Sequence, residues 1–206
     1  MNFQIHTFNR VAASLLLCGL AAHASAAGTV VLDSYGPDID MLEGWPTPLF
    51  QGQDIAIAFD IGSATDIQSI LTSIDGVGGV TLGIVARTGA LPDGSGWLYS
   101  THLVDPWANT LLSPAGWTLA AGSYWLVAVA DAGFSGQWQS GTDTPNGSWA
   151  YSSGGNWTTV DSPFTGMPAA RITVSAVPEP ASYGLMLAGG LLVAAAARRK
   201  SNATRG

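Results

Sequence analysis

The chain has almost no cysteine and very little histidine. Its single cysteine, Cys18, and two of its three histidines, His6 and His23, lie near the N-terminus. The segment from residue 27 to residue 176 therefore has no cysteine, and His102 is its only histidine. Such a segment cannot form disulfide bonds or use a thiolate, and it lacks the usual ligand set of a zinc site. Its stability must come from packing and hydrogen bonds.

Positive charge is also scarce. Between residues 27 and 176 only Arg87 and Arg171 are basic, against 13 acidic residues, so this segment has a formal net charge of −11. Nucleic-acid binding needs clustered lysine and arginine to neutralise phosphates, and we expect no nucleic-acid partner. The same charge disfavours an anionic membrane surface. About 150 residues are enough for one domain with a substantial core.

The signatures of common hydrolytic chemistry are missing or uninformative. No Gly-x-Ser-x-Gly motif occurs between residues 27 and 176. His102 lies in a strand-like stretch near Asp105, where a surface or core histidine is favoured over a catalytic base. Glycoside hydrolysis needs only two carboxylates, and 13 acids leave it open without indicating a pair. We expect a non-enzymatic protein, with an extracellular hydrolase as the minor alternative.

The N-terminus has the pattern of a secretory signal peptide. Arg10 precedes an apolar stretch over residues 11–20, and Ala24 and Ala26 form a small-x-small cleavage signal. We expect the export machinery to recognise residues 1–26 and signal peptidase to remove them.

The C-terminus carries a proline-flanked acid, an apolar run and a basic cluster, in that order. They are Val177, Pro178, Glu179 and Pro180, then residues 181–197, then Arg198, Arg199 and Lys200. As a helix the run is ~25 Å long, just enough to cross a bilayer core of about 30 Å with help from its flanks. A basic cluster normally stays cytoplasmic, which makes residues 201–206 a cytoplasmic tail. The prolines hold the approach to the membrane extended.

This tripartite order resembles the PEP-CTERM protein-sorting signal of Gram-negative bacteria, over residues 177–200. In that family an exosortase, a membrane-embedded cysteine transpeptidase-like enzyme, processes the signal, and the carriers often accompany exopolysaccharide production. The resemblance implies processing near Glu179, so this chain is the substrate in that reaction. It also implies a transient stay in the inner membrane through the C-terminal helix, followed by transfer to the cell surface or the exterior.

The segment from residue 27 to residue 176 is expected to be all-β. Residues 53–61 and 80–86 alternate apolar and polar side chains, the period of a half-buried strand. Residues 123–130 are apolar on both faces, as in a central strand covered on both sides. Further strands are expected over residues 97–104 and 169–175. Short strands separated by glycine-rich turns indicate a two-sheet sandwich of jelly-roll type.

Residues 116–126, GWTLAAGSYWL, resemble a hairpin of choice-of-anchor ectodomains. Those are β-sandwich modules that occur upstream of PEP-CTERM or other surface anchors. The resemblance extends loosely to residues 155–157 and to the last expected strand around Arg171. It implies a surface protein but no activity, because none is established for those domains.

One candidate binding group is acidic. Four acids fall within eleven residues: Asp33, Asp38, Asp40 and Glu43. Calcium takes several oxygen ligands from loops of this kind. The spacing does not match that of an EF-hand loop, and a solvated acidic loop is the favoured interpretation, with a calcium site as the alternative.

The other candidate group is aromatic. All eight tryptophans lie between residues 27 and 176, and one polar, glycine-rich region holds Trp138, Trp149, Tyr151 and Trp157. Aromatic faces beside amide and carboxylate groups are suited to stacking on sugar rings while hydrogen-bonding their hydroxyls. The favoured interpretation is that these rings fill a core without disulfides. The alternative is a glycan-binding module for exopolysaccharide, which requires the rings to be exposed.

Overall fold

The structure, a computed structural model, describes residues 28–36, 46–92, 96–142, 148–160, 166–176 and 187–191. One compact unit spans Gly28–Ala176. From the terminal segments only residues 187–191 are described, and they form a short helix. Within the described ranges, no helix is long and apolar enough to cross a membrane. The expected signal peptide, the sorting residues 177–180 and the basic residues 198–200 lie outside the described residues, as does most of the expected helix over 181–197.

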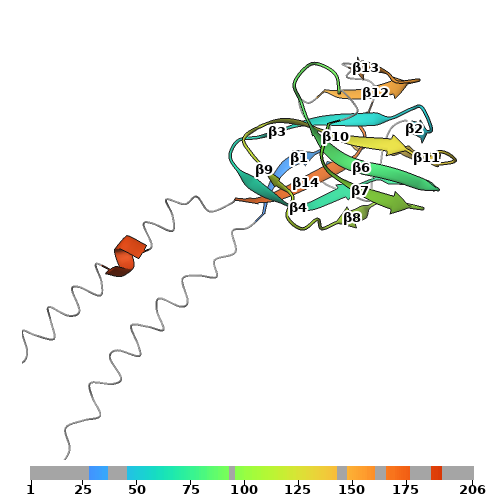
Figure 1. Ribbon diagram of the computed structural model, residues 1–206. Coiled ribbons are helices and arrows are strands. Elements are labelled where there is room, and N and C mark those ends of the chain that lie inside the picture. Colours follow the sequence, from blue (N-terminus) through green and yellow to red (C-terminus); the bar gives the residue numbers. More distant parts are fainter. Residues whose placement is uncertain are drawn as a thin grey trace, which may run out of the picture. The chain divides into compact units, whose positions relative to one another are not determined.

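The compact unit is an all-β sandwich, which confirms the fold class expected from the sequence. Its described strands form two larger antiparallel sheets and one small one (Figure 1). The first larger sheet has the order β1 (Thr29–Asp33), β14 (Ala170–Ala176), β4 (Thr65–Thr72) and β8 (Thr110–Leu112), with β9 (Thr118–Leu119) also paired to β4. The second has the order β13 (Asn156–Val160), β12 (Trp149–Ser153), β3 (Ile55–Ile61), β10 (Gly122–Ala130), β6 (Gly79–Ala86) and β7 (Trp97–Val104). The small sheet has the order β2 (Thr47–Phe50), β11 (Ser135–Trp138) and β5 (Ile74–Val77).

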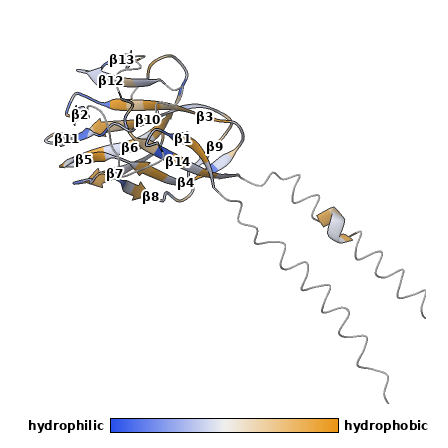
Figure 2. Ribbon diagram, turned by 180° about the vertical axis from the view of Figure 1, so that it is seen from behind, coloured by the Kyte–Doolittle hydropathy of each residue, from blue (hydrophilic) through white to orange (hydrophobic). Residues whose placement is uncertain are grey.

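All five strands expected from the sequence are present. They are β3, β6, β7, β10 and β14. Figure 2 shows the physical basis: the strands are mainly apolar, and the connections between them include hydrophilic segments.

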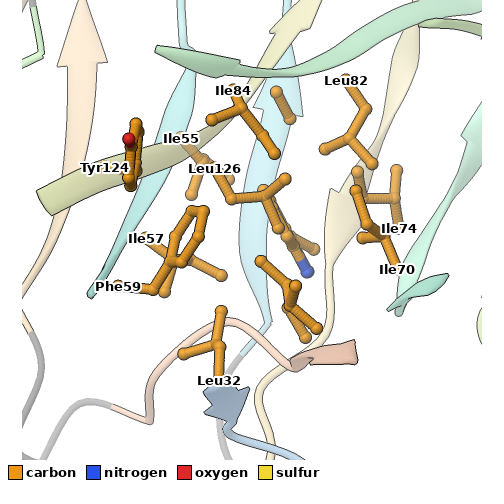
Figure 3. Packing of buried hydrophobic residues seen from close by; sticks show 14 of the residues in the cluster. Leu32, Ile55, Ile57, Phe59, Ile70, Ile74, Leu82, Ile84, Tyr124 and Leu126 are labelled. Atoms are coloured by element: carbon orange, nitrogen blue, oxygen red, sulfur yellow. The ribbon is translucent and has the colours of Figure 1, made fainter. Parts of the chain in front are cut away.

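The main core lies between the two larger sheets. Figure 3 shows apolar side chains from both of them converging: Ile55, Ile57 and Phe59 of β3, Leu82 and Ile84 of β6, Tyr124 and Leu126 of β10, Ile70 of β4, and Leu32 of β1. The small sheet adds Leu49, Ile74 and Trp138 to the same cluster. Burial of apolar surface is the main favourable contribution to folding, so this shared core is what joins the sheets.

The central strand β10 is covered on both faces, as its sequence predicts. Leu126 faces the main core, whereas Trp125 and Val127 form a second cluster with small residues of β3 and β12, including Ala56 and Ala150. The guanidinium of Arg87 lies 4.8 Å from the centre of the fully buried Trp125 ring, within range of a cation–π contact. This explains why residues 123–130 show no polar alternation.

Two leucine-to-alanine substitutions are expected to differ greatly in their effect on the free energy of unfolding. Leu126 is fully buried, whereas 62% of Leu111 on β8 is exposed. We expect Leu126→Ala to lower the free energy of unfolding by about 2–5 kcal/mol, because the lost burial is combined with a cavity. The matched variant Leu111→Ala should change it by about 0.5 kcal/mol or less. Urea unfolding of both variants measures the difference, and equal losses would contradict this description of the core.

Candidate functional site

The edge of the sandwich next to β7 carries an open hollow. β7 is the last strand of one larger sheet and β8 is the last strand of the other, and residues from both line the hollow. Its volume is about 260 Å³. The lining residues are Ser100, Thr101, Leu112, Ser113, Pro114 and Trp117. They combine three hydroxyl groups with one aromatic ring and two aliphatic side chains.

The indole of Trp117 is held against Tyr99 of β7. The two rings stack with centroids 5.4 Å apart and planes inclined by 14°. The Tyr99 hydroxyl donates a hydrogen bond to the carbonyl oxygen of Thr118 (2.9 Å) and accepts one from the Thr118 amide (3.2 Å). These contacts join β7 to the segment that follows β8, so they fix the aromatic wall of the hollow.

The segment that carries Trp117 is also bonded to β4. The carbonyl oxygen of Trp117 accepts a hydrogen bond from the amide of Ile67 (2.8 Å), and the Thr118 hydroxyl donates to the carboxylate of Asp66. Gly116 has a φ of 74°, a left-handed conformation that favours glycine. Trp117 is therefore positioned by a tight turn on one side and by backbone pairing on the other.

None of the six described residues that line the hollow is charged. His102 follows Thr101 on β7, and its Nε2 lies 2.7 Å from Oδ2 of Asp131. Both side chains are about half exposed. This histidine is a surface residue paired with an acid, in agreement with the favoured interpretation of the sequence. The hollow thus offers hydroxyls and an aromatic surface but no acid–base pair.

The tryptophans singled out from the sequence lie elsewhere. Trp138 is fully buried in the main core, where its Nε1 donates a hydrogen bond to the carbonyl oxygen of Ala169 (2.9 Å), and Trp149 is only 7% exposed. These two buried rings cannot stack on a sugar. They agree with the favoured interpretation, that such rings fill the core, and exclude Trp138 and Trp149 from the alternative of an exposed aromatic group. The cause is strand alternation: β11 directs Trp138 inward although both of its sequence neighbours are glutamines, and β12 directs Trp149 into the main core.

The other two members of that group are partly buried. Tyr151 packs against the main core, and Trp157 packs against the cluster around Trp125. The rings of Trp149 and Tyr151 are tilted by 45° with centroids 6.3 Å apart. The four aromatics therefore do not form one exposed row. The sequence reasoning missed Tyr99, Trp117 and the hydroxyl-bearing residues beside them, which are distant in sequence and give no local pattern.

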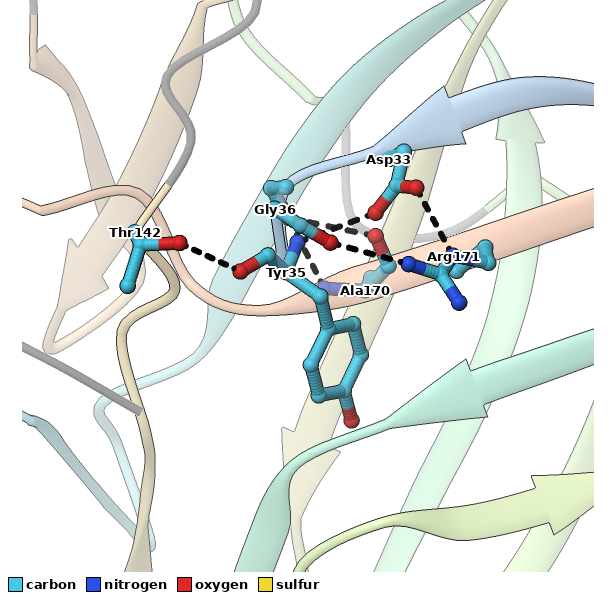
Figure 4. A network of polar contacts seen from close by, with 7 residues as sticks. Asp33, Tyr35, Gly36, Thr142, Ala170 and Arg171 are labelled. Atoms are coloured by element: carbon cyan, nitrogen blue, oxygen red, sulfur yellow. Dashed lines mark hydrogen bonds and ion pairs between the residues drawn. The ribbon is translucent and has the colours of Figure 1, made fainter. Parts of the chain in front are cut away.

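Asp33, the first member of the acidic candidate group, belongs to a polar network that joins β1 to β14 (Figure 4). Its Oδ2 accepts a hydrogen bond from Nε of Arg171 (2.8 Å), and its Oδ1 accepts one from the amide of Tyr35 (3.1 Å). Arg171 also donates from Nη2 to the carbonyl oxygen of Gly36 (3.1 Å). Both carboxylate oxygens of Asp33 thus have structural partners.

The rest of the acidic group cannot be placed. Asp38, Asp40 and Glu43 lie outside the described residues. In the described part of the chain, no three histidine, cysteine, aspartate or glutamate side chains come together as metal ligands. Calcium binding therefore stays a prediction.

A model of the PEP-CTERM protein-sorting motif matches residues 176–200. The chain carries a PEP-CTERM sorting motif. The motif implies export to the cell envelope or surface by exosortase-dependent sorting, with an exosortase as the partner that recognises it. The match does not extend into the sandwich. No curated protein matches this chain, and no finding supports the choice-of-anchor resemblance of residues 116–126.

Asp54 predicts how stability depends on pH. Burial raises the pKa of this carboxyl above its ordinary value of 3.8, and a hydrogen bond from the Ser152 hydroxyl (3.2 Å) opposes the shift. The folded state therefore disfavours the ionised form, and stability falls as pH rises from the ordinary pKa through the raised one. We expect Asp54→Asn to be more stable than wild type at pH 7, with a smaller difference at pH 3.5.

Urea midpoints at the two pH values measure this effect. Asp60→Asn, which changes an exposed aspartate of β3, the strand that begins directly after Asp54, is the matched control. A variant Asp54→Asn that is less stable than wild type at pH 7 would show that the bond to Ser152 outweighs the burial of charge.

The network around Asp33 predicts the response to calcium. A cation bound only to the folded state would raise the melting temperature. Because both Asp33 oxygens are engaged, we expect millimolar calcium to leave the melting temperature unchanged, with magnesium as the control. An increase with calcium that Asp33→Asn abolishes would contradict this and establish a site that includes Asp33.

Proposed function

We propose that this chain is a non-enzymatic protein of the cell surface or extracellular matrix, associated with exopolysaccharide and processed by an exosortase. The match of the PEP-CTERM motif to residues 176–200 carries the proposal. The composition supports it as well: a segment with no cysteine, one histidine and a net charge of −11 is suited to life outside the cell and poor in catalytic groups.

In this proposal the two termini act in sequence. Signal peptidase removes residues 1–26, and the helix over residues 181–197 holds the chain in the inner membrane, with the basic residues inside. The extended segment around Glu179 then faces the periplasm, where the exosortase acts on it. Because the helix is only moderately apolar, its hold on the membrane is temporary.

The boundary between sandwich and motif supports this order of events. β14 ends at Ala176, and the motif match begins at the same residue. β14 is bonded to β1 on one side and to β4 on the other, so it is an interior strand of its sheet. Cleavage near Glu179 therefore removes the sorting segment without removing any strand of the sandwich.

Glycan binding is the second candidate function. The observation that favours it is the hollow beside β7, where the stacked ring of Trp117 lies near the hydroxyl-bearing residues Thr101 and Ser113. An extracellular hydrolase is a minor alternative. The six residues that line the hollow include no carboxylate, so the hollow supplies no acid pair for glycoside hydrolysis.

The sorting proposal predicts where a processing-defective chain accumulates. Glu179→Ala should give a correctly oriented precursor that remains uncut in the inner membrane, because the segment that the exosortase reads is altered. Fractionation followed by mass spectrometry of the C-terminus measures this. Glu43→Ala, which changes an acid far from the motif in sequence, is the control and should be processed as wild type.

A second variant tests the role of the basic cluster. Replacing Arg198, Arg199 and Lys200 by glutamine removes charges that cost a few kcal/mol each to move across lipid. The precursor should then lose its orientation and escape processing. If the wild-type protein at the cell surface still contains Lys200, the helix is a permanent anchor and the sorting proposal is wrong.

A further inference from the structure

We propose that the hollow between the edge strands β7 and β8 binds one sugar unit of an uncharged polysaccharide chain. Trp117 supplies the aromatic surface. Thr101, which shares a face of β7 with Tyr99, and Ser113 supply the hydroxyl groups. The inference rests on the glycan-binding function proposed above and gives that function a site, a ligand class and named contacts.

The stacking surface is fixed before any ligand arrives. Tyr99 covers one face of the Trp117 indole, and the ring also packs against the main core, so only the remaining part of the indole borders the hollow. The two hydrogen bonds between Tyr99 and Thr118 prevent the pair from moving independently. A preorganised ring loses little conformational entropy on binding, which favours affinity for a weakly interacting ligand such as a sugar.

The size and polarity of the hollow suit a single pyranose ring. At about 260 Å³ it is smaller than the pockets of about 300–1,000 Å³ that enclose drug-sized molecules. Serine and threonine hydroxyls both donate and accept hydrogen bonds, as sugar hydroxyls do. Ser113 is exposed, so a ligand can reach its hydroxyl from solvent. Because the hollow is open, the rest of a polysaccharide chain can continue into solvent.

The charge of the sandwich selects an uncharged ligand. None of the six lining side chains is charged, and the segment around them has a net charge of −11. A polysaccharide with carboxylate or phosphate groups would be repelled and would find no cation in the hollow. An uncharged polysaccharide is not repelled and needs no cation in the hollow.

The same edge is poorly suited to a peptide strand. Strand addition needs a long, regular edge with unpaired backbone groups. β8 has only three residues, and the pairing of β7 shifts register between its partners Ile84 and Val85, as at a β-bulge. An aromatic ring with hydroxyls is therefore the more suitable recognition element here.

A competing surface surrounds Trp107, which is 78% exposed. Val77 of β5 and Val104 of β7 are also exposed, and the amide of Gly76 donates a hydrogen bond to the carbonyl oxygen of Pro106 (3.1 Å), which joins β5 to the residue before Trp107. This surface offers exposed apolar area. Substitution of Trp107 is therefore a suitable control for nonspecific binding by an exposed tryptophan.

The test uses the full chain and the exopolysaccharide of the producing bacterium, separated by anion exchange into uncharged and acidic fractions. We expect retention on immobilised uncharged polysaccharide and little on the acidic fraction. Trp117→Ala should weaken binding by about tenfold or more, because it removes the stacking surface. Trp107→Ala should change binding by less than about twofold.

A milder pair of variants separates binding from folding. Thr101→Val and Ser113→Ala remove single hydroxyls at the hollow and should weaken binding several-fold with an unchanged melting temperature. Ser153→Ala, which removes an exposed hydroxyl at the end of β12, is the matched control and should bind as wild type. Binding that is equally weakened by Trp107→Ala, or restricted to the acidic fraction, would overturn the inference.

The outcome also separates this inference from the sorting proposal. A wild-type chain that reaches the cell surface in processed form but binds neither fraction refutes the site and leaves the sorting function intact. A chain that binds uncharged polysaccharide through Trp117 but is never processed supports the site and refutes the sorting function.

Discussion

The packing of two apolar sheet faces against each other is the constraint on which the rest of this structure depends. No disulfide is available between residues 27 and 176, and two basic residues leave little scope for ion pairs. The free energy of folding must therefore come mainly from the core that β3, β6 and β10 share with β4 and β14. The ion pair of Asp33 and Arg171, residues that face each other in the pairing of β1 with β14, adds to this by fixing β1 on its neighbour.

The need for a well-packed core explains why three of the tryptophans are buried. Trp125 and Trp138 are fully buried and Trp149 nearly so, because large rings fill a sandwich more effectively than aliphatic side chains alone. With its interior filled in this way, the sandwich has its binding opportunities at strand edges and loops. The stacked pair of Tyr99 and Trp117 lies at such an edge, where the two larger sheets end.

The fold class and the main strands could be predicted from the sequence, but the candidate site could not. β3, β6 and β10 have enough apolar residues for their periodicity to be recognised, whereas β11 reads SGQW and β9 has two residues. Trp138 lies between Gln137 and Gln139, so its sequence neighbourhood is polar and leaves both a buried and an exposed ring open. The same alternation is the pattern of a strand that directs one tryptophan inward. The hollow joins residues of β7 to residues that follow β8, a proximity that only the pairing of strands creates.

The division between sandwich and sorting motif has a physical basis in the position of β14. A strand bonded on both sides is held more firmly than an edge strand, since releasing it would break two ladders of hydrogen bonds. The strand that precedes the motif is therefore one that hydrogen bonds hold on both sides. Processing can act on the segment after Ala176 without loosening the core or the edge that carries Trp117. In the proposals made above, sorting belongs to the segment after Ala176 and polysaccharide binding to the edge of the sandwich, so a change in one need not alter the other.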